Sequence, residues 1–207
     1  MSKERLEFFS DSVLAIIITI LVLGLHVPNV LPHASFREYL TAMAPLWPKF
    51  GSFVLSFIII AIYWINHNYF FHKIDKITPG LVWLNILWLF TVSVIPFSTL
   101  LLGEHYDDHF PIVFYATNTL FAASAFYLLR LYVYRKALFK PGSAESPEYL
   151  GPARSVPGIV LSLAAIILAF INVYAALICI LVYPIVYAAP SRIPWLTRRL
   201  LRKNSMR

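Results

Sequence analysis

The chain has 207 residues, of which 59% are hydrophobic and only 13% are charged, and its mean hydropathy is +0.72. About a quarter of the residues of a soluble globular domain are charged, so this composition excludes that class and indicates an integral membrane protein. The formal net charge is +7. The single cysteine, Cys179, stands inside an apolar run, which excludes an intrachain disulfide and a paired-cysteine metal or redox site.

Apolar runs recur along the whole chain. Because roughly 20 apolar residues cross a hydrocarbon core of about 30 Å, we predict six transmembrane helices in one domain that covers residues 1–207. The expected spans are about 7–27, 46–71, 80–102, 110–136, 157–172 and 174–189, followed by a basic tail at 191–207. The predicted fold is therefore an all-α polytopic membrane protein. No small-residue cleavage site follows the first run, so we expect that run to be retained.

The first predicted helix begins with polar residues. In the stretch RLEFFSDSVLAIIITILVLGLHVP, Arg5, Ser10 and Asp11 directly precede the apolar residues. A charged side chain at the centre of a membrane costs about 2.5–3.5 kcal/mol on insertion scales, so such groups usually face protein or water. We therefore expect these three side chains to bind polar groups of neighbouring helices.

Polar groups that could serve as partners occur in the second and third spans. In YWINHNYFFH, Trp64 and Asn68 share one face of a helix and His67 lies beside them. The third span contributes Asn85. His67 is interpreted either as a hydrogen-bonded core histidine or as a proton or zinc sensor.

The loops predict the orientation. Lysine and arginine accumulate in short cytoplasmic loops. With six spans, most basic residues fall on one side, whereas the third loop, GEHYDDH, is acidic and falls on the other. Both termini of this multi-pass membrane protein are therefore expected in the cytoplasm. This bias, with contacts between the tail and anionic lipids, explains the net charge without nucleic-acid binding.

Sequence signatures of catalysis are missing. The chain contains no HExxH, no GxxxxGK[ST], no GxSxG and no paired cysteines. We therefore expect no enzymatic activity, no catalytic residues, no bound metal and no cofactor.

Arg5, Phe9, Ser10 and Asp11 spell RxxxFSD at the head of the first span. This motif resembles the signature of the transmembrane protein 175 family of potassium channels. Animal members of that family are endo-lysosomal and carry two six-span repeats, each with the motif, whereas this chain carries one and is similar to the bacterial form. The likeness extends to the span count, to a Trp and a His late in the second span, and to an Asn in the third.

The resemblance implies a homotetrameric, potassium-selective or potassium-preferring channel in the bacterial inner membrane. The first helices would line a pore without a TVGYG filter, and potassium would be the permeant ion. Carried over, the aliphatic constriction is Ile16, Ile20 and Leu23, which share one helical stripe. Thr19 is the candidate filter hydroxyl.

The signature itself is assigned a structural role. On a helical wheel Asp11 lies about 140° from Ile16, so it points away from the expected pore. The expected structural cluster consists of Arg5, Phe9, Ser10, Asp11, Trp64, His67 and Asn85.

Alternatives remain at this stage. The first helix is apolar all round, so periodicity alone does not distinguish a pore face from lipid or core packing. Thr19 could instead bond to its own helix. A secondary transporter, a membrane enzyme and a non-conducting membrane scaffold are the rival functions, although no internal repeat is evident that would favour a transporter.

Overall fold

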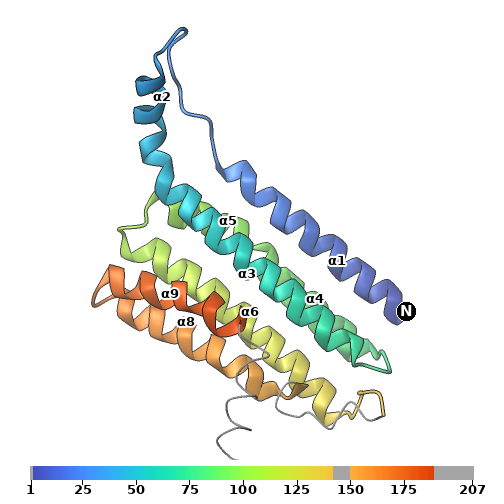
Figure 1. Cartoon of the computed structure of the whole chain (residues 1–207). Helices are drawn as coiled ribbons and strands as arrows, with labels where there is room; N and C mark the ends of the chain where they lie inside the picture. The colour runs from blue at the N-terminus through green and yellow to red at the C-terminus, as the bar shows by residue number, and fades with distance from the viewer. Residues whose placement is uncertain (1, 142–149, 189–207) are drawn as a thin grey trace, which may run out of the picture.

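The computed structural model describes residues 2–141 and 150–188, so the predicted basic tail at 191–207 lies outside the described residues. The long helices run roughly side by side in one bundle (Figure 1). In chain order the elements are α1 (Lys3–Ile20), η1 (Leu21–Gly24), α2 (Phe36–Met43), η2 (Ala44–Leu46), α3 (Trp47–His72), α4 (Pro79–Ser93), α5 (Ile95–Glu104), α6 (His109–Arg135), η4 (Pro152–Ser155), α8 (Val156–Ala169) and α9 (Val173–Ala188).

Within the described residues, five helical segments are long and apolar enough to cross a membrane, and a sixth apolar helix is shorter. The five are Lys3–Gly24, Phe36–His72, Pro79–Glu104, His109–Arg135 and Pro152–Ala169, and the shorter one is Val173–Tyr187. Each predicted span corresponds to one of these segments.

The first two segments begin earlier than the apolar runs predict. The Ser2 side chain accepts a hydrogen bond from the Arg5 N–H at 3.3 Å and caps α1, so the helix starts at Lys3 instead of residue 7, and it ends at Gly24 instead of 27. Ahead of the second span, Ser35 and Glu38 form a capping box that starts the short helix α2. The first span therefore starts and ends a few residues earlier than predicted, and a separate helix precedes the second.

The third predicted span is not one continuous helix. It divides at Val94 into α4 and α5. Pro96 lacks the N–H that a continuous helix would donate to the Val92 carbonyl, which explains the break. The predicted span over 80–102 thus corresponds to two consecutive helices within one apolar segment.

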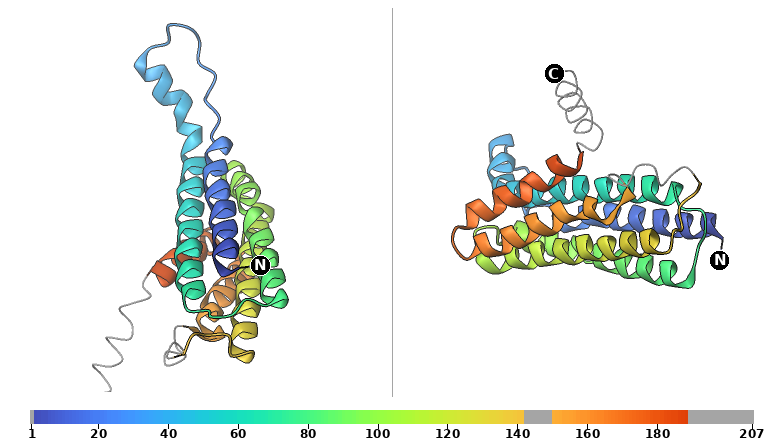
Figure 2. Two further views of the ribbon diagram at one scale, coloured as in Figure 1. Left: turned by 90° about the vertical axis from the view of Figure 1, so that its right-hand side faces the viewer. Right: turned by 90° about the horizontal axis from the view of Figure 1, so that it is seen from below.

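The two ends of the bundle differ. The N-terminus, the connection from α3 to α4 and the end of α6 lie at one end, whereas α2 projects beyond the other end (Figures 1 and 2). Helix α1 packs against α3 and α4, and α6 packs against α4 and α8. This arrangement leaves α1 on the outside of the bundle.

Candidate functional site

Helix α1, continued by η1, has one buried face and one exposed face. The buried positions follow the helical repeat and are Leu6, Ser10, Leu14, Ile17 and Leu21. The opposite face has no cover within the described residues, and its large apolar side chains include Phe8, Phe9, Ile16, Ile20 and Leu23. The polar signature residues are divided between these two faces.

Asn85 is the centre of the buried half of the cluster. The His67 Nε2 lies 2.9 Å from the Asn85 Oδ1, and the Asn85 Nδ2 donates to the Ser10 Oγ at 2.8 Å. Ser10 in turn donates to the Leu6 carbonyl at 2.9 Å. Ser10, His67 and Asn85 are all fully buried. One asparagine therefore joins α1, α3 and α4 through side-chain hydrogen bonds.

The directions of these bonds fix the tautomer of His67. Because the Asn85 Oδ1 can only accept, the His67 Nε2 carries the hydrogen. The Nδ1 is buried and has no hydrogen-bond partner in the described part of the chain. The imidazole stacks between Trp88, at 4.8 Å between ring centroids, and Phe71, at 4.1 Å. His67 is thus held between two aromatic rings.

Asp11 forms the second half of the cluster, nearer the surface. Its Oδ1 accepts from the Trp64 Nε1 at 2.9 Å and from the Asn68 Nδ2 at 3.3 Å. Trp64 is 45% exposed. His67 was a candidate partner of Asp11, but it bonds to Asn85 instead. Asn68, which shares the face of Trp64, was not placed in the predicted cluster.

Arg5 and Phe9 differ from the other signature residues. Both are exposed, and no hydrogen bond of the Arg5 guanidinium to a described residue is observed. Within this one chain, Arg5 does not join the described part of the cluster, and its contact with neighbouring helices stays a prediction. On the helical wheel Arg5 lies about 120° from Asp11 but only about 20° from Ile16, which explains why it shares the exposed face.

The predicted constriction residues all lie on the exposed face. Ile16 is 57%, Ile20 44% and Leu23 71% exposed, whereas Leu14 on the opposite side is 2% exposed. Leu23 stands in the 3-10 segment η1, so its direction departs from the stripe of an ideal α-helix.

Thr19 lies on the same face and bonds to its own helix. Its Oγ1 donates towards the Ala15 and Ile16 carbonyls, at 3.0 and 2.9 Å. This is the arrangement that the alternative interpretation expected. A hydroxyl has one proton and two lone pairs, so the bond to the helix leaves the oxygen able to face a cation.

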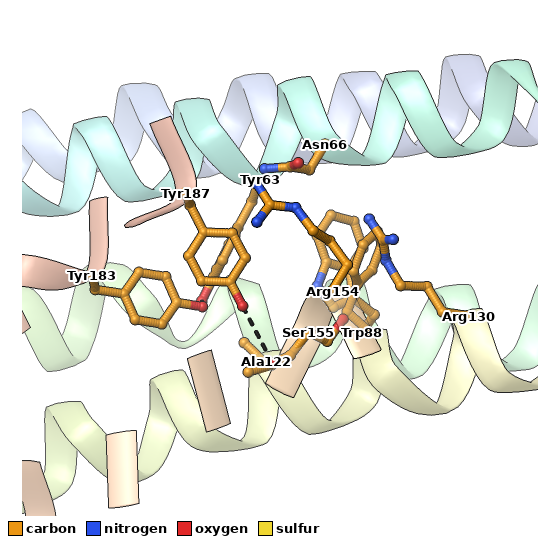
Figure 3. Close-up of a pocket in the computed structure, with 11 residues that line it drawn as sticks. Tyr63, Asn66, Trp88, Ala122, Arg130, Arg154, Ser155, Tyr183 and Tyr187 are labelled. Atoms are coloured by element: carbon orange, nitrogen blue, oxygen red, sulfur yellow. Dashed lines mark hydrogen bonds between the residues drawn. The ribbon is translucent and has the colours of Figure 1, made fainter. Parts of the chain in front are cut away.

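A second enclosed region lies between α3, α6, η4 and α9 (Figure 3). The Tyr63 and Tyr183 hydroxyls lie 2.9 Å apart. The Tyr187 hydroxyl accepts from the Gly158 N–H at 2.9 Å and donates to the Ser155 carbonyl at 3.2 Å, the contact drawn in Figure 3. These bonds attach α9 to the start of α8 and to α3, so the region serves to hold the last helix on the bundle.

Comparisons with known proteins agree with the motif. A model of the family described as "Endosomal/lysosomal potassium channel TMEM175" matches residues 5–96. A protein of a Chryseobacterium strain named as a potassium channel is 37% identical over 135 residues, which are 65% of this chain and 67% of that protein. The human protein named "Endosomal/lysosomal proton channel TMEM175" is 30% identical over 136 residues, 62% of this chain but 27% of that protein.

Solved structures share the fold. The crystal structure of a lysosomal potassium-selective channel TMEM175 homolog from Chamaesiphon minutus superposes with a TM-score of 0.72 at 30% identity, covering 90% of this chain and 96% of that one. A variant of the potassium channel MtTMEM175 gives a TM-score of 0.59 at 20% identity, over 96% and 93% of the two chains, and shows a common fold. The matched motif, the bacterial relatives and the shared fold together establish that this chain belongs to the TMEM175 family.

Proposed function

We propose that this chain is a subunit of a potassium-selective or potassium-preferring channel whose pore is lined by α1 of each subunit and has no TVGYG filter. The carrying observation is the exposed apolar stripe of Ile16, Ile20 and Leu23 on a helix whose opposite face is anchored by buried polar contacts. Bacterial relatives named as potassium channels support the choice of ion. We propose conduction, not catalysis, because the family is one of ion channels.

The proposed assembly is a homotetramer. One helix per subunit cannot enclose a path, so several copies must contribute α1 to one pore. The half-exposed contact between Asp11 and Trp64 supports this, because a carboxylate beside the hydrocarbon core is costly unless protein or water covers it. A second copy packed next to α1 would provide that cover.

The aliphatic rings would act as the constriction. Four copies of Ile16, Ile20 and Leu23 present no polar atom at their levels, so an ion passes only when the ring widens and wets. Thr19 stands between Ile16 and Ile20 in the sequence and would supply the polar oxygens nearest to this region. We propose it as the filter hydroxyl.

The proposal also covers the orientation of the chain, its membrane and its permeant ion. Both termini are placed in the cytoplasm, and the protein in a bacterial inner membrane, where basic residues contact anionic lipids. Potassium is the permeant species, and the proposal includes no cofactor, structural metal or nucleic-acid partner.

Ion flux into liposomes tests the proposal. Purified protein is reconstituted with a potassium gradient, a sodium gradient or a proton gradient, and currents are recorded in planar bilayers. Stepwise currents carried better by potassium than by sodium are expected. Proton conduction without potassium conduction would favour the activity named for the human relative. Saturable slow flux would indicate a transporter, and no flux a scaffold.

Native mass measurement in detergent tests the assembly. A fourfold mass is expected at working concentration. A species that remains monomeric or dimeric while it conducts would contradict a pore built from one α1 per subunit.

A further inference from the structure

Two connections at the N-terminal end of the bundle are joined by backbone hydrogen bonds. Ile74, which follows α3, forms an antiparallel bridge with Phe139, which follows α6. The Asp75 N–H donates to the Leu138 carbonyl at 2.8 Å, and the Lys140 N–H donates to the Lys73 carbonyl at 2.9 Å. The end of α3 and the end of α6 are therefore held together as one unit.

An unusual backbone conformation directs the chain into this bridge. Ala137 has a φ of 49°, in the left-handed region that favours glycine. Its N–H bonds to the Tyr134 carbonyl and the Leu138 N–H to the Val133 carbonyl, both at 3.2 Å, which ends α6 in a Schellman motif. A strained residue persists only where its surroundings hold it, and such residues often mark switch regions. In this Schellman motif, Ala137 turns the chain from the end of α6 into the bridge.

The first turn of α1 is fixed to the same unit. The Lys3 Nζ donates to the Ile74 carbonyl at 2.8 Å and to the His72 carbonyl at 3.3 Å, and it lies 3.7 Å from the Glu7 Oε1. Ile74 is fully buried, and Phe139 packs edge-on against Phe70 at 5.9 Å. A single ammonium group thus links α1 directly to the connection after α3, 71 residues away in the sequence, and reaches the connection after α6 only through the bridge.

We propose that Lys3 and the paired segments 73–75 and 138–140 form a latch that couples the connection after α6 to the position of α1. In this structure, Lys3 holds the first turn of α1 against the bridge. Release of the bridge frees that turn. A displacement of the connection after α6 would therefore be transmitted to α1, the helix that we propose to line the pore. In this sense the latch is a regulatory device. Only this effect on conduction rests on the proposed function.

Hydrogen exchange on the full chain in detergent tests the latch. In Lys3→Met the Asp75 and Lys140 amides should exchange about tenfold faster, because hydrogen bonds from charged groups are the strong ones. Coupling is reciprocal, so Phe139→Ala should speed exchange in the first turns of α1 by a similar factor. Phe139→Ala still tests the latch if Lys3→Met does not assemble.

Two control variants separate the latch from simple charge effects. Lys76→Met removes an exposed cation from the same connection, and Glu7→Gln removes the ion pair while Lys3 keeps its carbonyl partners. Both should exchange like the parent at Asp75 and Lys140. Equal exchange in Lys3→Met, Lys76→Met and the parent would overturn the latch.

Conduction gives the final readout. Lys3→Met and Phe139→Ala should change the open probability in the same direction, while Lys76→Met should not. If the parent does not conduct, the proposed function fails, but the exchange result still decides the latch. If the parent conducts and both latch variants gate like the parent, the regulatory inference is overturned.

Discussion

The two faces of α1 contrast in how they are held. The buried face carries Leu6, Ser10 and Leu14, and Ser10 is bonded to Asn85 on α4. The exposed face carries Ile16 and Ile20 and has no cover within the described residues. One helix therefore combines a firmly attached side with a side that the chain itself does not complete.

The contrast explains why a carboxylate and a serine stand at the head of an apolar helix. Aliphatic contacts slide over one another at little cost, whereas a satisfied polar network specifies one register. Asn85 and Asp11 set the rotation of α1, and this rotation presents Ile16 outward. Within the signature, Ser10 and Asp11 thus orient the face of Ile16 without lying on it, whereas Arg5 and Phe9 share that face.

Breaking the attached face should have the largest effect. In Asn85→Leu, the His67 Nε2–H loses its acceptor in the core, at a cost of roughly 1–3 kcal/mol for one orphaned group, while the Ser10 hydroxyl loses a donor but keeps its bond to the Leu6 carbonyl. We expect a lower unfolding temperature and loss of the oligomer in detergent. Thermal unfolding followed by light scattering measures both. A variant as stable as the parent would show that the network does not hold the helix.

Truncation on each face should separate stability from flux. Leu14→Ala removes a fully packed side chain and should lower the free energy of unfolding by about 2 kcal/mol. Ile16→Ala removes an exposed one and should lower it by less than about 0.5 kcal/mol. Because Ile16 is proposed to narrow the pore, Ile16→Ala and Ile16→Asn should raise flux and weaken the preference for potassium over sodium.

Matched liposomes provide the control for this pair. Leu14→Ala should conduct with the selectivity of the parent in whatever fraction assembles. Equal flux and selectivity in Ile16→Asn and the parent would remove the pore from this face of α1.

Much of the fold could be predicted from the sequence, because hydrophobic length is a strong signal in membrane proteins. Each of the six spans corresponds to an apolar helix. The errors have local causes. The capping side chain of Ser2 starts α1 earlier, and Pro96 divides the third span. A count of apolar residues contains neither effect.

The site was predicted less completely. The motif indicated which residues form the polar cluster, but it did not indicate which of them bond to each other. Asn85 forms hydrogen bonds with Ser10 and His67, and Asp11 forms one with Trp64. Pairing depends on the rotation of three helices relative to one another. The exposed position of Arg5 could have been inferred from its wheel angle, which is close to that of Ile16.

Substitution of Asp11 tests the polar contact that lies between the buried and the exposed face of α1. In Asp11→Ala the Trp64 and Asn68 donors lose their acceptor, but Trp64 is half-exposed, so we expect a loss of only about 1 kcal/mol. Assembly should weaken before ion preference changes. Asp11→Asn keeps an acceptor oxygen and should be milder. A stable Asp11→Ala protein with altered ion preference would make Asp11 a filter residue and would contradict the wheel argument.

Thr19 should give the smallest effect on stability and the most specific effect on conduction. Thr19→Val keeps the shape of the side chain but removes an oxygen that bonds only to its own helix, so the free energy of unfolding should change by less than about 0.5 kcal/mol. If the Thr19 oxygen faces the ion, the variant loses the polar ring nearest to the constriction, and the ratio of potassium to sodium permeability should fall. Reversal potentials under bi-ionic conditions measure this ratio directly. Thr19→Ser restores the oxygen and should restore the ratio. An unchanged ratio in Thr19→Val would mean that the hydroxyl serves only its helix and that the aliphatic rings alone set the ion preference.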